Sequence, residues 1–304
     1  MKKILLSTAL LSATAGMAAA EVSFSGYGRF GLEYVEGRAQ ETQIAQRLRF
    51  NINAKTETDA GVTFGGRIRM QYTDGNTGAG LNAAYVYAEY EGFRVEVGNS
   101  NTAFDSTALM YNSEMGFLDS SAGDPIFKFF GYSSGAYGAT QANRMGIFAG
   151  YGVGDLNVRV SYVTVDQTSA ASLDDEVGIS ADYKFGAITV AAAYVKNGEG
   201  VADQDLYFIG AEYAINDAAN VGLLYFGDDS PAPADGSVAT LYGNYTFDAV
   251  TVKAYITSGE NQGTEDTAYG LGADYDLGGA RLSGSIQSDF NGNMFGDVGV
   301  RFDF

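Results

Sequence analysis

The sequence predicts an all-β fold, a closed antiparallel barrel of about sixteen strands, and three observations support it. Apolar and polar residues alternate with a period of two over most of the chain, as in 21–35 and 176–185. Glycine is abundant (41 residues) and proline rare (3), which suits long, curved strands. The sequence shows no amphipathic helical run of useful length.

The first twenty residues are predicted to be a secretory signal peptide that lies outside the fold. Lys2 and Lys3 form a positive start, residues 4–11 are mostly apolar, and Ala18 and Ala20 occupy the small-residue positions before a cleavage site. The apolar stretch is shorter than the roughly 20 residues that a spanning helix needs. The mature chain is therefore expected to form a single domain over residues 21–304.

The composition excludes several functional classes. The chain has neither His nor Cys, so the common catalytic triads and dyads cannot be built, and we expect no enzyme activity. A net charge of −19 makes nucleic acid an unsuitable partner. The match of residues 26–31 to G-x-G-x-x-G lies inside an alternating strand rather than before a helix, so no dinucleotide cofactor is expected.

The strands are expected to be joined by short turns at one end and longer loops at the other. Alternating segments include 21–35, 46–55, 65–72, 84–98, 176–185, 267–277 and 296–304. Short turns lie at 58–61, 91–92, 152–155, 185–187, 216–220, 247–249 and 277–280, and longer acidic stretches at 74–82, 166–175, 196–205, 227–237 and 258–267. This layout is typical of an outer-membrane barrel, in which a tilted spanning strand needs about 9–11 residues.

One stretch interrupts the alternation. Residues 99–140 lack a sustained period of two and follow the predicted fifth strand. A loop this long inside a compact domain usually has a function.

Alternation alone fits both a soluble sandwich and a membrane barrel, because the two differ in which face is apolar. A membrane barrel turns apolar residues to lipid and polar ones to the lumen. Aromatic residues at strand ends favour the barrel: Tyr34, Tyr72, Tyr90, Tyr183, Tyr194, Tyr245 and Phe247. A final strand ending at Phe304 would close against the first and leave no exposed edge. A secreted β-sandwich adhesin or surface-layer protein remains the alternative.

Four segments carry a family resemblance: the signal peptide, EVSFSGYGRFGLEY (21–34), AYVYAEYEGFRVEVGNSNTAFD (84–105) and VGVRFDF (298–304). With them the chain resembles general-diffusion porins of the Gram-negative outer membrane, most closely those of the Rhodobacter type. The resemblance implies a trimeric sixteen-stranded barrel in the outer membrane, whose third outer loop folds into the lumen. It also implies passive diffusion of ions and small hydrophilic solutes.

Arginines share the polar register of their strands. Their apolar neighbours, such as Leu48 and Met70, would then contact lipid or another subunit. In a barrel these arginines line the lumen, because an arginine facing lipid costs roughly 2–4 kcal/mol at mid-membrane. The predicted lumenal set is Arg29, Arg47, Arg49, Arg67, Arg69, Arg94, Arg144 and Arg159.

Clustered like charges need opposite partners, and the long loop offers Asp105, Glu114, Asp119 and Asp124. We therefore expect an acidic loop opposite a basic wall, with a transverse field at the narrowest point.

Acidic clusters lie in or beside the expected outer loops. They are Asp174, Asp175 and Glu176; Asp203 and Asp205; Asp228 and Asp229; and Glu265 and Asp266. Oxygen-rich clusters suit Ca²⁺, although none has the spacing of a known calcium loop. Diffuse attraction of cations is the simpler interpretation, and no required cofactor is expected.

Overall fold

The computed structural model describes residues 20–124, 128–132, 144–164, 173–230 and 235–304. Nearly all of the predicted signal peptide and part of the predicted loop at 99–140 lie outside these residues. Within the described residues, no helix is long and apolar enough to cross a membrane.

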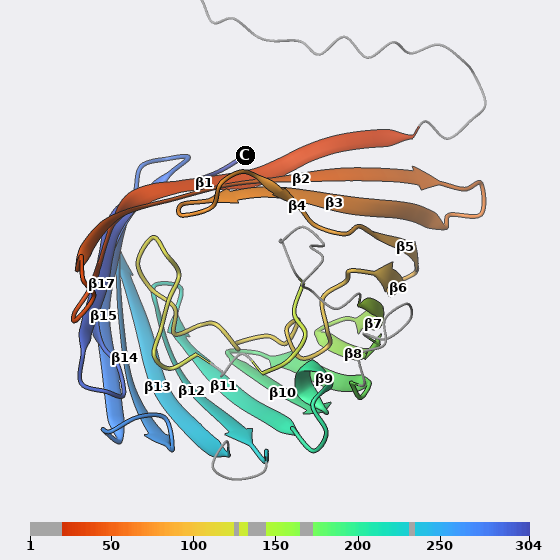
Figure 1. The fold of residues 1–304 in the computed structure, drawn as a ribbon. Helices are drawn as coiled ribbons and strands as arrows, with labels where there is room; N and C mark the ends of the chain where they lie inside the picture. The colour runs from red at the N-terminus through yellow and green to blue at the C-terminus, as the bar shows by residue number, and fades with distance from the viewer. Residues whose placement is uncertain (1–19, 125–127, 133–143, 165–172, 231–234) are drawn as a thin grey trace, which may run out of the picture.

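Seventeen antiparallel strands form one closed sheet in the described chain (Figure 1). They are β1 (Glu21–Val35), β2 (Thr42–Glu57), β3 (Thr63–Thr73), β4 (Gly80–Leu81), β5 (Tyr85–Tyr90), β6 (Phe93–Gly98), β7 (Met145–Val153), β8 (Leu156–Thr164), β9 (Glu176–Phe185), β10 (Ile188–Lys196), β11 (Leu206–Asn216), β12 (Ala219–Asp228), β13 (Gly236–Phe247), β14 (Val250–Glu260), β15 (Thr267–Asp276), β16 (Arg281–Ser288) and β17 (Met294–Asp303). A short 3₁₀ turn spans Gly198–Gly200.

The two-residue strand β4 reconciles this count with the predicted sixteen. It pairs with β3 at Met70 and Gln71, whereas β5 pairs with β3 over Thr63–Arg67. β4 and β5 therefore share one position beside β3, and seventeen strands occupy sixteen positions. The prediction of about sixteen strands is confirmed.

The barrel closes between the first and last strands, as predicted. β1 pairs with both β2 and β17, and the backbones of Gly26 and Phe304 exchange hydrogen bonds of 2.7 and 3.0 Å. Closure removes the two open edges that a sheet of this length would otherwise expose.

The outer face is apolar around the ring. Phe24 is 66% exposed, Ile209 59% and Leu223 57%, whereas the residues next to Ile209 and Leu223 in the chain, Phe208 and Leu224, are buried on the inner face. Such a face suits the hydrocarbon of a bilayer.

Residues 99–124, here called the inner segment, follow β6, the strand in the fifth position. They lie inside the ring (Figure 1). They form turns and one isolated bridge, Met115 with Ser120. Buried Phe104 contacts Phe129 and Phe226 with ring centroids 4.8 and 5.9 Å apart.

This packing corrects the expectation that lumenal positions are polar throughout. Most buried side chains of β10–β13 are apolar, including Ala191, Val195, Phe208 and Phe226, while Asp228 and Thr240 are the polar exceptions among the described residues. They belong to the same hydrophobic cluster as Phe104, Met110 and Met115. The polar rule holds for a wall that faces water, and here the inner segment replaces the water.

Candidate functional site

Four arginines stand side by side across four neighbouring strands. The register places Arg281 of β16 opposite Arg301 of β17, Arg301 opposite Arg29 of β1, and Arg29 opposite Arg47 of β2. Like charges directly opposite each other destabilise a sheet. This row therefore needs an anion close by.

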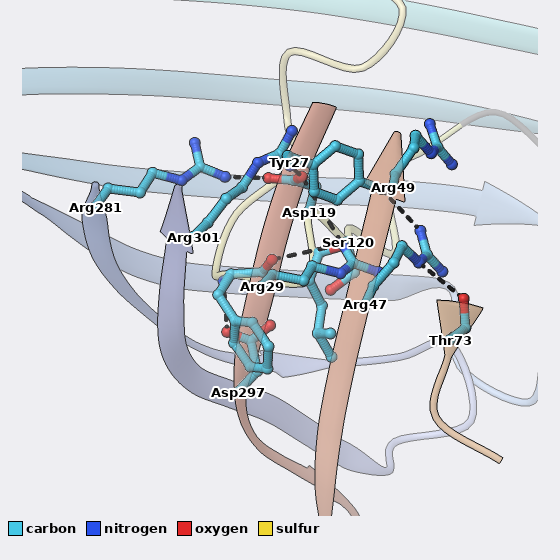
Figure 2. Close-up of polar contacts among 12 residues, drawn as sticks. Tyr27, Arg29, Arg47, Arg49, Thr73, Asp119, Ser120, Arg281, Asp297 and Arg301 are labelled. Atoms are coloured by element: carbon cyan, nitrogen blue, oxygen red, sulfur yellow. Dashed lines mark hydrogen bonds and ion pairs between the residues drawn. The ribbon is translucent and has the colours of Figure 1, made fainter. Parts of the chain in front are cut away.

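Asp119, at the tip of the inner segment, supplies that anion (Figure 2). Its carboxylate forms ion pairs with Arg281 and Arg301, and Arg29 Nη1 lies 3.9 Å from Oδ2. Asp119 has a positive φ of 51°, within the tight turn closed by the Met115–Ser120 bridge. One carboxylate thus offsets three of the four arginines in the row.

Backbone groups of the same tip also form hydrogen bonds with the barrel wall. The amide of Phe117 donates to Asp297 Oδ1 at 2.9 Å, and Arg29 donates to the carbonyl of Leu118. Phe117 is fully buried against Gly31 and Gly299, where an added Cβ would lie within 2.9 Å of its ring. Because these two glycines have no Cβ, the Phe117 ring can pack directly against the strand backbone.

The inner segment is hydrogen-bonded along much of one side of the barrel. Ser161 of β8 accepts from the amide of Ala103, and Ser180 of β9 donates to its carbonyl, at 2.9 and 2.7 Å. Further contacts run from Asn112 to Glu212 and Tyr242, from Ala122 to Tyr255, and from Gln287 to Ser120. These bonds hold the segment against β8–β17 and β1.

Arg47, Arg49, Arg67 and Arg69 project from β2 and β3, and the hydrogen bonds described for Arg47, Arg49 and Arg69 include neutral side chains. Arg47 donates to Thr73 and Tyr27 at 3.3 Å each, and Arg49 to Gln71 at 2.6 Å. Arg69 donates to Asn51 at 3.3 Å. All four are half-buried. They leave a basic surface that the Asp119 cluster does not cover.

The remaining predicted arginines have other partners. Arg94 forms ion pairs of 2.7 Å with Glu89 and Glu96, and Arg159 pairs with Asp182. Arg144 donates to Asn99 at 2.9 Å and lies over the ring of Phe130. The structure does not bring these three into the Asp119 cluster.

Of the other acidic residues of the segment, Asp105 and Asp124 accept hydrogen bonds from side chains of the segment itself. Asp105 accepts from the Tyr111 hydroxyl at 2.7 Å, and burial raises the pKa of its carboxyl while Arg144 and Arg69 oppose that rise. Burial also raises the pKa of Glu114, and the nearby charge of Asp124 adds to the rise. Burial raises the pKa of Asp124 as well, against the hydrogen bond from Ser113. Glu114 and Asp124 therefore hold protons more tightly than ordinary carboxyls.

Sequence reasoning missed Arg281, Arg301 and Asp297. Arg301 and Asp297 occupy the polar register of the last strand, but nothing in the chain order links them to Asp119, about 180 residues earlier. The signal that could have found them was barrel closure itself, since it makes β17 the neighbour of β1.

Three of the four acidic outer clusters have side-chain partners in the described chain. Asp228 pairs with Lys128, Asp175 accepts from Tyr162, and Asp205 accepts from Tyr194. Among the described residues, no three acidic side chains are close enough to hold a metal ion. Cation attraction at these clusters remains a prediction.

Known proteins resemble this chain in both sequence and fold. A family model described as Gram-negative porin matches residues 7–293. The porin of Fuscovulum blasticum is 49% identical over 293 residues, covering 93% of this chain and all of that protein. The porin of Rhodobacter capsulatus is 26% identical over 322 residues, with the same coverage. The solved structure of a triple mutant of the Rhodopseudomonas blastica porin is 47% identical, with a TM-score of 0.88 over 93% of this chain and all of that one.

Proposed function

The chain belongs to the Gram-negative porin family, and from this premise we propose that solutes pass between the inner segment and the arginine-bearing wall of β1–β3. The protein is an outer-membrane channel for passive diffusion, and it is not an enzyme. The alternative of a secreted β-sandwich is wrong, because the sheet closes on itself.

One observation carries the proposed path: the hydrogen bonds of residues 103–123 of the inner segment run to one side of the barrel. Its hydrogen bonds reach β8, β9, β11, β13, β14, β16, β17 and β1. Arg47, Arg49, Arg67 and Arg69 lie on β2 and β3, outside this set of strands, and are half-buried, and Tyr132 from later in the loop lies over Arg67 and Arg69. Water and small polar solutes would meet these guanidinium groups on one side and the acidic segment on the other.

The field between the two sides sets the ion preference in this proposal. In a solvated lumen each charge pair is worth about 1 kcal/mol or less, so the summed field matters more than any pair. Arginines attract anions, and the segment's carboxylates attract cations. The balance decides selectivity.

The test is the reversal potential of refolded protein in a planar bilayer under a salt gradient. Replacing Arg47, Arg49, Arg67 and Arg69 together by Gln should move selectivity toward cations and leave the barrel folded. The reference is Lys253→Gln with Arg159→Gln, which removes cations already paired with Asp274 and Asp182. An unchanged reversal potential in the arginine variant would place the path elsewhere, and the absence of stepwise conductance in the wild type would refute the channel.

We also propose that three copies assemble through the outer face of β2–β6. β5 and β6 have six residues each, so the wall is short there. An apolar hollow of about 660 Å³ is lined by small residues, Ala54, Gly66 and Ala88, between Phe64 and Val97. A second subunit could fill this hollow with larger side chains. A native mass in mild detergent equal to one chain would contradict the trimer.

Export by a signal peptide over residues 1–20 is proposed on the sequence pattern alone. Amino-terminal sequencing of protein taken from the outer membrane should begin at Glu21. A chain that still begins at Met1 would contradict cleavage.

A further inference from the structure

A polar hollow lies in the lumen between the inner segment and the short turns of β9–β14. Along β11 the inward-facing positions change from the buried ring of Phe208 to Glu212 and then to Asn216, next to the turn that leads to β12. The inner segment reaches as far as Glu212, where the amide of Asn112 donates to the carboxylate at 3.0 Å. The space beyond that contact, here called the turn-end hollow, has a volume of about 730 Å³.

Small residues leave room for the turn-end hollow. Those that line it are Gly186, Ala187, Ala214, Ala218 and Ala219. Nearer the inner segment, the inward positions of β11–β13 are filled by Phe208, Leu224 and Tyr242. Sites that take small molecules typically have volumes of roughly 300–1,000 Å³. The hollow is therefore large enough to hold a small solute.

The polar groups around the hollow have bonding capacity that the described chain leaves unused. Asn220 Oδ1 is buried and has no hydrogen-bond partner among the described residues. The carboxylate of Glu212 accepts from Tyr242 and Asn112, and both of these bonds are to Oε2. Among the described residues, neither Lys184 nor Glu212 forms an ion pair. The hollow therefore presents one cation and one anion that a solute can pair with.

The register fixes the spacing of these two charges. Lys184 of β9 lies opposite Thr189 of β10, which lies opposite Glu212 of β11. Two interstrand spacings separate the two charged residues by roughly 9.4–9.8 Å. An extended peptide advances about 3.3–3.6 Å per residue, so three residues span about the same distance. Asn220 and Asn244 lie opposite each other on β12 and β13, one level nearer the turns.

We propose that the turn-end hollow binds short zwitterionic peptides as they pass through the channel. The peptide's carboxylate pairs with Lys184 and its ammonium group with Glu212. The side-chain amides of Asn220 and Asn244 each offer a donor and an acceptor, which match the peptide bonds. A neutral solute leaves both protein charges uncompensated, and a solute with one charge leaves one of them so. This inference deepens the proposed function and rests on it.

The first test is block of the ionic current by peptides of increasing length. Glycine, diglycine and triglycine are added to the wild-type channel in a planar bilayer at about 0.1 M salt, where screening extends over about 10 Å. The apparent dissociation constant should fall along the series, because the second charge contact forms at high effective concentration once the peptide spans the hollow.

Capped and neutral probes separate charge recognition from size. N-acetyltriglycine lacks the ammonium group, triglycine amide lacks the carboxylate, and sucrose carries no charge. Each should bind more weakly than triglycine. Equal block by triglycine and its two capped forms, or by sucrose, would overturn the proposal, since block would then depend on size alone.

Substitutions assign each end of the peptide to one residue. Lys184→Gln and Glu212→Gln should each weaken triglycine binding about fivefold. In the Lys184 variant triglycine should bind no better than its amide, and in the Glu212 variant no better than its acetylated form. A general loosening of the inner segment would not produce this crossed pattern.

Two variants outside the hollow control for net charge. Lys196→Gln and Glu260→Gln change exposed residues at the opposite ends of β10 and β14. Triglycine binding should stay within about twofold of the wild type in both. Weakening equal to that of the Lys184 and Glu212 variants would reduce the effect to net charge and overturn the inference.

Calorimetric titration of detergent-folded protein with triglycine gives a reading independent of current. Heat of binding in the wild type and its loss in the Lys184 and Glu212 variants support the proposal, and no heat in the wild type overturns it. A channel that conducts but is not blocked by triglycine refutes the peptide site alone. A protein that forms no channel refutes the proposed function instead.

Discussion

Two walls of the same barrel use their lumenal positions in opposite ways. On β1–β3 these positions carry Arg, Asn and Gln side chains that are mostly half-buried. On β10–β13 they include Ala193, Leu206, Leu224 and Val238, which are buried in a hydrophobic cluster. The comparison shows that an inward-facing position in a barrel is not one environment, because the inner segment divides the lumen into a wet side and a dry side.

The two walls are also stabilised by different forces. On the dry side, fully burying a large apolar side chain contributes about 1.5–3 kcal/mol. On the wet side, arginines stay hydrated and contribute little, except where Asp119 offsets the row of Arg281, Arg301 and Arg29. The dry wall therefore fixes the inner segment, and the wet wall is the one that we propose acts on solutes.

The largest effect on stability is expected from a substitution in the hydrophobic cluster of the dry side. Phe104→Ala should lower the free energy of unfolding by about 3–5 kcal/mol, because it leaves a cavity between Phe129 and Phe226. Denaturant unfolding of detergent-folded protein measures the loss. Phe24→Ala is the matched control, since that ring is exposed on the outer face and should change stability little. Equal losses in the two variants would mean that the inner cluster contributes no more to the free energy of unfolding than the outer face does.

A smaller effect is expected where the two sides meet. Asp119→Asn leaves three arginines facing one another and should lower stability by about 1–3 kcal/mol, because the lumen partly solvates the charges. Single-channel recordings should also show larger current fluctuations, since the tip loses its ion pairs. Asp303→Asn removes a carboxylate that lies 3.8 Å from Arg301 and is largely exposed, so it serves as control. An Asp119 variant with the same stability and the same current fluctuations as the control would contradict the role of Asp119 in holding the tip.

The smallest effect is expected from pH. The raised pKa values of Glu114 and Asp124 mean that the folded protein binds protons more tightly than the unfolded chain, whose carboxyls titrate near pH 4. Their contribution to stability is therefore complete below the unfolded value and is lost as pH rises through the folded value. As pH falls through that same range, the segment loses negative charge and selectivity should move toward anions.

Reversal potentials measured between about pH 9 and pH 5 test this pH dependence. Glu114→Gln should flatten the curve, because it removes one of the two groups and the repulsion between them. A curve of wild-type shape in this variant would assign the pH dependence to other residues.

The sequence by itself determined the strands, their faces and their approximate number. The reason is that alternation is a local property: once Arg47 faces the lumen, Leu48 must face outward, whatever its neighbours are. The break in alternation at residue 99 likewise marked the inner segment. That the apolar neighbours of the arginines face outward agrees with the exposure of Leu48 (42%) and Met70 (36%).

The tertiary structure decided which residues meet. Closure made β17 the neighbour of β1 and so brought Arg301 and Arg281 to Asp119, a contact that spans most of the chain. The path of residues 99–124 decided that the inner positions of β10–β13 would be dry, although the same alternation alone predicted water there. Local patterns fix which way a side chain points, but what it meets depends on distant segments whose positions are set by closing the sheet and packing its interior.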